Sequence, residues 1–174
     1  MTLQQKEAMF LSASKFAVVG ASSNSSKFGS KALKYLIEQH KDVVPINPKA
    51  TEIQGLKCLK SLSELPDPTH TSVSVVVPPN EALAVLQQAK ALGIPALWLQ
   101  PGVADAAVVQ YIADAQLGDR CIYTAPTPGA ALHPAVRVAA ALPTPGPCLF
   151  AYCTALQKKK DSSMDLGDEV PGLA

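Results

Sequence analysis

The chain has 174 residues, enough for one domain with extra length, and its formal net charge is only +1. This balance excludes a long-range field that would draw the protein to nucleic acid or to an anionic membrane. No apolar run approaches the roughly 18 residues of a transmembrane helix, and the polar segment 1–15 lacks the apolar centre of a signal peptide, so we expect a cytoplasmic protein.

The first half of the chain alternates apolar runs with helical patterns. An apolar run at 16–19 ends at Gly20 and predicts a buried parallel strand. Residues 22–24 are candidate caps for a helix whose apolar residues recur at spacings of three and four through 32–37. The run at 43–46 predicts the next strand.

The second half continues this alternation with short connections. The expected elements are a short strand at 57–59, a short helix at 61–65, a strand at 73–77, a helix from its cap Asn80 to 92 closed by Gly93, a strand at 94–99, a helix at 104–115 and a last strand at 120–123. The alternation predicts an α/β protein with a Rossmann-like, doubly wound parallel sheet in three α/β/α layers. Such sheets bind ligands beyond the carboxyl ends of their strands.

Two segments beyond residue 123 depart from this alternation. Segment 124–145 is an insert rich in proline and alanine, and its five prolines disfavour regular structure. Two interpretations of this insert stay open: a genuine elaboration, or untranslated sequence retained in a gene model. The polar segment 154–174 is expected to be a disordered tail.

The first strand-to-helix turn is the leading candidate for phosphate binding. Gly20 permits a tight turn, and the small residues Ala21, Ser22 and Ser23 let backbone N–H groups approach an anion, to which Lys27 adds a charge. Serines stand where the dinucleotide fingerprint G-x-G-x-x-G has its second and third glycines, so that fingerprint fails. The alternative is an ordinary turn rich in capping residues.

The second strand ends in Asn47, Pro48 and Lys49. A site for NAD has an acidic residue near this point to hold the ribose hydroxyls. A lysine instead suits a ribose that carries a phosphate, as in NADP or coenzyme A. The alternative interpretation is a solvated lysine in a surface turn, since exposed lysines are common.

Two later strand ends are also candidates for ligand contact. Val77 and Pro78 offer a rigid apolar ledge on which a purine could lie, although the prolines there also serve simply to end the strand. Gln100 and Gly102 follow the fifth strand, where the glutamine can face a ligand, while Trp98 is expected in the core.

Four motifs, at 20–23, 46–49, 77–80 and 98–102, occur in order at four strand ends. Together they resemble the small, single-domain coenzyme A-binding proteins, which are similar to the nucleotide-binding domain of the succinyl-CoA synthetase α subunit. The resemblance covers 13–123 and implies that residues 146–153, displaced by the insert 124–145, complete this domain. It also implies a pyrophosphate site, a site for the ribose 3′-phosphate, an adenine site and a pantetheine exit. Their residues would be, respectively, Gly20, Ala21, Ser22, Ser23 and Lys27; Asn47, Pro48 and Lys49; Val77 and Pro78; and Gln100 and Gly102.

The sequence indicates binding rather than catalysis. No carboxylate pair or Ser/His arrangement appears at the strand ends, so no catalytic residue is assigned. The scattered cysteines and histidines lack the spacing of a metal site, so none is expected. The leading hypothesis is non-catalytic binding of coenzyme A or an acyl-CoA through its ADP moiety. An NADP-dependent oxidoreductase, or a degenerate copy without a ligand, remains the alternative.

Overall fold

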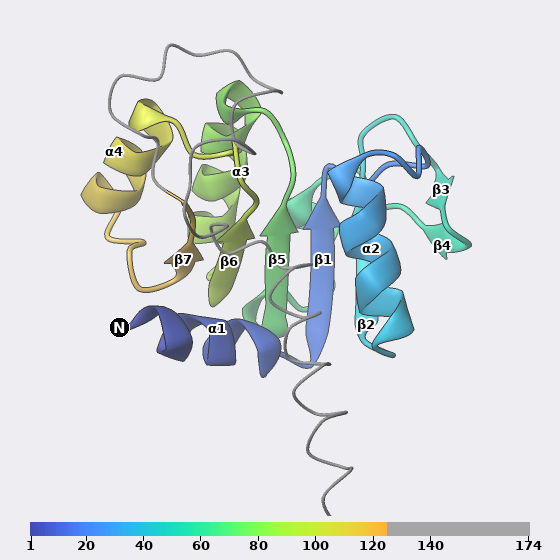
Figure 1. Cartoon of the computed structure of the whole chain (residues 1–174), viewed down its shortest axis with the longest axis horizontal. Helices are drawn as coiled ribbons and strands as arrows, with labels where there is room; N and C mark the ends of the chain where they lie inside the picture. Colours follow the sequence, from blue (N-terminus) through green and yellow to red (C-terminus); the bar gives the residue numbers. More distant parts are fainter. Residues whose placement is uncertain (125–174) are drawn as a thin grey trace, which may run out of the picture.

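The computed structural model of the protein describes residues 1–124 (Figure 1). The expected insert at 124–145, apart from its first residue, the completing segment at 146–153 and the tail at 154–174 lie outside the described residues. Within the described part, no helix is long and apolar enough to cross a membrane.

The centre of the molecule is a five-stranded parallel sheet with the strand order β2-β1-β5-β6-β7. Chain order therefore runs outward in two directions from the adjacent strands β1 and β5, and this is the doubly wound arrangement expected from the sequence. The strands are β1 (Lys15–Val19), β2 (Asp42–Ile46), β5 (Thr71–Val75), β6 (Ala96–Leu99) and β7 (Cys121–Ile122).

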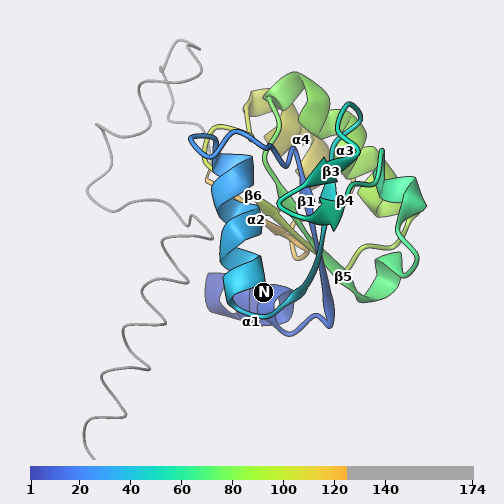
Figure 2. The ribbon, with the colours of Figure 1, turned by 90° about the vertical axis from the view of Figure 1, so that its right-hand side faces the viewer.

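Helices cover both faces of the sheet and complete the three expected layers (Figure 2). One face packs against α1 (Leu3–Leu11) and α2 (Phe28–Glu38). The other face packs against α3 (Pro79–Ala91) and α4 (Ala106–Asp114). The α/β, Rossmann-like fold class is thus confirmed.

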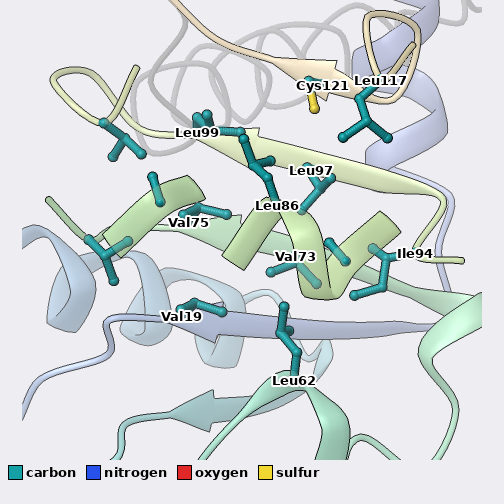
Figure 3. Packing of buried hydrophobic residues seen from close by; sticks show 14 of the residues in the cluster. Val19, Leu62, Val73, Val75, Leu86, Ile94, Leu97, Leu99, Leu117 and Cys121 are labelled. Atoms are coloured by element: carbon teal, nitrogen blue, oxygen red, sulfur yellow. The ribbon is translucent and has the colours of Figure 1, made fainter. Parts of the chain in front are cut away.

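Alternating strand residues supply two aliphatic cores, as parallel strands buried on both faces require. Val19, Val73, Val75 and Leu97 face α3 and α4, and Figure 3 shows these side chains interdigitating with Leu86 and Ile94. On the opposite face, Phe16, Val18 and Trp98 belong to the second core. Trp98 is fully buried, as expected from its apolar neighbours.

Helix α1 was not expected from the sequence. The Thr2 hydroxyl accepts from the Gln5 backbone and the Gln5 side chain accepts from the Thr2 backbone, which is a capping box. Phe10 of this helix is fully buried and packs edge-on against Phe16 and Trp98, with ring centroids 5.7 and 5.3 Å away. The pattern Thr2-x-x-Gln5 was therefore a usable signal.

The segment after β2 differs from expectation. The short strand expected at 57–59 appears as β4 (Leu56–Lys57), which pairs antiparallel with β3 (Glu52–Ile53), while Leu59 forms one parallel bridge to Ile46. The helix expected at 61–65 is the 3-10 turn η1 (Leu62–Glu64), and a second such turn, η2 (Pro68–His70), precedes β5.

Candidate functional site

The four candidate segments lie at one edge of the sheet. They follow β2, β1, β5 and β6, which are neighbours in that order and run parallel, so their carboxyl ends share one edge. After β1 the chain passes to α2 on one face, and after β5 it passes to α3 on the other (Figure 1). Doubly wound folds bind their ligands at the point where the connections diverge in this way.

Gly20 allows the backbone after β1 to approach the backbone after β5 closely. Its φ of +85° lies in the left-handed region, and a Cβ there would lie 2.2 Å from the Val76 carbonyl oxygen. Gly29, in the first turn of α2, is equally restricted, because its Cβ would lie 2.1 Å from the Gly20 carbonyl oxygen. Gly29 therefore provides the close helix-to-strand packing that the fingerprint's last glycine provides, although the G-x-G-x-x-G spacing is absent.

Helix α2 begins later than predicted. Its N-cap is Lys27, so the residues at 22–24 expected to cap it belong to an eight-residue loop, 20–27. Within that loop Ser22 Oγ accepts from the Asn24 N–H at 3.2 Å. Asn24 Oδ1 accepts from the N–H and Oγ of Ser26 at 3.0 and 2.7 Å. The hydroxyl and amide groups stabilise the loop itself, which is why they do not cap the helix.

The N-terminus of α2 is open to an anion. No side chain caps it, and Lys27 and Phe28 beside it are exposed. The first N–H groups of a helix have no partner within the helix, and the helix dipole favours negative charge at this end. Backbone donors and an exposed lysine thus lie at one helix end, a combination suited to a phosphate or diphosphate.

Asn47 connects the end of β2 to the loop 20–27. Its Nδ2 donates to the Ala21 carbonyl at 2.8 Å, and its Oδ1 accepts from the N–H groups of Lys49 and Ala50 at 2.8 and 3.2 Å. Both ends of this side-chain amide are therefore engaged within the protein. Pro48 and Lys49 are exposed on the same turn.

The end of β5 also differs from the sequence prediction. The strand ends at Val75 rather than at 77, and Pro78 rather than Asn80 is the N-cap of α3. Val77 is 9% exposed and belongs to the core, whereas Pro78 is exposed. Of this pair, Pro78 is the residue presented to solvent at this edge of the sheet.

Gln100 is buried rather than presented at the tip of β6. It is 3% exposed, and its Nε2 donates to Ser74 Oγ at 3.3 Å. Gly102 follows it on an exposed turn with φ of +88° and no atom within 4 Å of an added Cβ. The two residues expected at the pantetheine exit therefore differ in solvent exposure: Gln100 is buried and Gly102 is exposed.

Gln54 is a residue of this region that sequence reasoning missed. It lies in the tight turn between β3 and β4 with φ of +53°, and its Nε2 donates to both the carbonyl and the Oγ of Ser30 at 2.9 Å. The hairpin is thereby attached to the first turn of α2. The pair Gln54-Gly55 was a weak signal of a turn, but nothing local indicated its distant partner.

The two histidines of the described residues lie away from this edge. His40 and His70 precede β2 and β5, and therefore lie at the amino end of the sheet. A five-residue strand separates the two ends by about 16 Å. Burial raises the pKa of the Cys58 thiol, and it raises the pKa of Cys121 to about 12. No group of three potential metal ligands occurs within residues 1–124.

Comparison with curated proteins finds similarity to two ADP-forming acetate–CoA ligase chains. An ADP-forming acetate–CoA ligase of Methanocaldococcus jannaschii is 39% identical over 64 residues, which are 37% of this chain and 9% of the ligase. The α subunit of ADP-forming acetate–CoA ligase II of Pyrococcus furiosus is 39% identical over 61 residues, 34% of this chain and 13% of the subunit. The matched segments are thus a small part of either relative's length.

Solved structures of other proteins also resemble this chain. A conserved hypothetical protein from Pyrococcus furiosus has 36% identity and a TM-score of 0.55, over 65% of this chain and 93% of that one. A dinucleotide-forming acetyl-coenzyme A synthetase of Candidatus Korarchaeum cryptofilum, solved with phosphate and ADP, has 27% identity and a TM-score of 0.53. That match covers 65% of this chain and 25% of the synthetase.

The family match covers most of the described residues. The model described as a CoA binding domain matches residues 14–126, which include all four motifs at the strand ends. The resemblance inferred from those motifs is thereby confirmed. Because the match extends over more than half of the 174 residues, the chain belongs to the CoA binding domain family.

Proposed function

We propose that this protein binds coenzyme A or an acyl-CoA through its ADP moiety and performs no chemistry on it. The observation that carries the proposal is the uncapped N-terminus of α2 beside Gly20, in a chain of the CoA binding domain family. The pyrophosphate would accept hydrogen bonds from the loop 20–27 and the first turn of α2, with Lys27 adding charge.

The ribose 3′-phosphate would meet Lys49. This lysine is exposed on the turn that Asn47 attaches to the loop 20–27, so one ligand could reach both sites. The adenine would lie against Pro78, and the pantetheine would leave past Gly102.

The absence of chemistry is proposed from the position of the reactive groups. His40 and His70 lie at the far end of the sheet, and the thiols of Cys58 and Cys121 are buried with raised pKa values. A thiol held neutral is a poor nucleophile. The two relatives named as ligases are far longer than the matched segment, so their activity is not assigned to this chain.

The test is calorimetry with CoA, dephospho-CoA and NADP at fixed salt. Because CoA and dephospho-CoA differ only in the 3′-phosphate, Lys49→Ala should lose about 1.5–3 kcal/mol of CoA binding, roughly a tenfold to hundredfold rise in Kd. It should bind CoA about as weakly as the parent binds dephospho-CoA, since both changes remove one contact.

Lys90→Ala is the matched control, because Lys90 is an exposed lysine in the last turn of α3, away from the strand ends. It should leave the preference for CoA unchanged. If Lys49→Ala retains the full preference for CoA over dephospho-CoA, Lys49 is a surface lysine only. If NADP binds the parent more tightly than CoA does, the NADP-dependent oxidoreductase replaces this proposal.

A further inference from the structure

Asn47 occupies a position between two parts of the proposed site. One side of its amide group is bound to the carbonyl of Ala21, directly after the Gly20 turn. The other side accepts from the backbone N–H groups of Lys49 and Ala50. One half-buried side chain thus joins the backbone of the loop 20–27 to the backbone that carries Lys49.

The remaining contacts of the 47–60 segment hold it from other directions. The Asn47 N–H donates to the Leu59 carbonyl at 2.9 Å, and Lys60 Nζ donates to the Ala50 carbonyl at 2.7 Å. Gln54 attaches the hairpin to Ser30. These contacts fix the segment on β2 and α2, but among the described side chains only Asn47 links Lys49's own turn to the loop 20–27.

We infer that Asn47 is a positioning residue that fixes Lys49 relative to the loop 20–27 and thereby sets the preference for a ligand with a third, ribose-bound phosphate. This inference rests on the proposed function. It requires no direct contact between Asn47 and the phosphate, because the Oδ1 atom and one N–H of Nδ2 are already hydrogen-bonded inside the protein. A flexible lysine gains selectivity only if its backbone is held at a fixed distance from the rest of the site.

The variants Asn47→Ala and Asn47→Ser test the inference. Serine retains a hydroxyl that can accept from the Lys49 N–H but cannot reach Ala21, so both variants lose the link between the loops. In calorimetry, each should reduce the preference for CoA over dephospho-CoA to below about threefold while keeping residual binding of both ligands. A variant that keeps the parent's preference would overturn the inference.

Two further measurements separate positioning from general loosening. In the Lys49→Ala background, Asn47→Ala should change CoA affinity by less than about twofold, because its effect acts through Lys49. Gln54→Gly is the matched control: it removes another amide-to-carbonyl bond of the same segment, and glycine accepts the positive φ. If Gln54→Gly abolishes the preference equally, Asn47 has no special role.

Amide hydrogen exchange tests the link without any ligand. In both Asn47 variants of the full chain, exchange should accelerate in the segment 47–50 and also in the loop 20–27, while Gln54→Gly should leave both unchanged. Acceleration confined to 47–50 would contradict the inference. A parent that fails to bind CoA would refute the proposed function, and the exchange data would still decide whether Asn47 couples the two loops.

Discussion

Helices α2 and α4 each follow a strand of the same parallel sheet, but they begin in different ways. At α4 the N-cap Asp105 accepts the Val108 N–H at 2.9 Å, so the helix satisfies one of its own terminal donors. At α2 the N-cap is Lys27, which accepts no such bond through its side chain and adds positive charge to an already positive helix end. The difference separates a helix end completed by its own sequence from one that is open to an external anion.

The open end of α2 depends on two glycines, and removing the first should have the largest effect. Gly20→Ala forces a Cβ to within 2.2 Å of backbone at a φ of +85°, so we expect a loss of about 3 kcal/mol or more in the free energy of unfolding. Urea denaturation measures it.

Gly102→Ala provides the matched control. Its φ is +88°, but an added Cβ meets nothing within 4 Å, so the cost should be only about 1 kcal/mol. Equal losses for the two variants would show that backbone conformation, and not the close approach of β1 to β5, makes Gly20 necessary.

Giving α2 a side-chain cap like that of α4 should raise the stability of the protein and weaken its CoA binding. Lys27→Asp supplies a capping carboxylate, which should raise the free energy of unfolding by about 0.5–1 kcal/mol. The same change should weaken CoA binding by roughly tenfold to a hundredfold, because a negative group occupies the anion site. Denaturation and calorimetry measure the two effects, and unchanged CoA affinity would exclude this helix end as the pyrophosphate site.

The reverse change at α4 should affect stability alone. Asp105→Ala removes the bond to Val108 and should cost about 1 kcal/mol of the free energy of unfolding. CoA affinity should stay within about twofold of the parent, since this cap has its partner within α4. A large loss of CoA affinity would show that α4 also contributes to the site.

The sequence was informative where its signals were local. Apolar runs ended by glycine or proline located every strand of the parallel sheet to within about two residues, and Gly93 was correctly placed after α3 with a φ of +69°. Helix α1 was missed although its capping box was readable at Thr2 and Gln5. The segment 1–15 is polar and mixed in charge, so its capping box was the local signal for this helix.

Site residues were harder to interpret than strands. The capping role expected at 22–24 was wrong, because α2 begins at its N-cap Lys27, and Ser22 and Asn24 bond within their own loop. The expected ligand contacts of Asn47 and Gln100 stay predictions, but Asn47 is bonded to Ala21 and Gln100 is buried against Ser74. Residue type indicated that these positions are polar, and it could not indicate which partner satisfies them.

By itself the sequence determined the α/β alternation, the order of the four motifs and their placement at strand ends, because hydrophobic periodicity and glycine or proline breaks act within a few residues. The tertiary structure decided how those ends meet: Gly29 against Gly20, Asn47 on Ala21 and Gln54 on Ser30. Each of these contacts joins residues from 9 to 26 positions apart, so local patterns do not reveal it. Asn47 meets Ala21 because the parallel pairing of β1 and β2 brings their carboxyl ends to one edge.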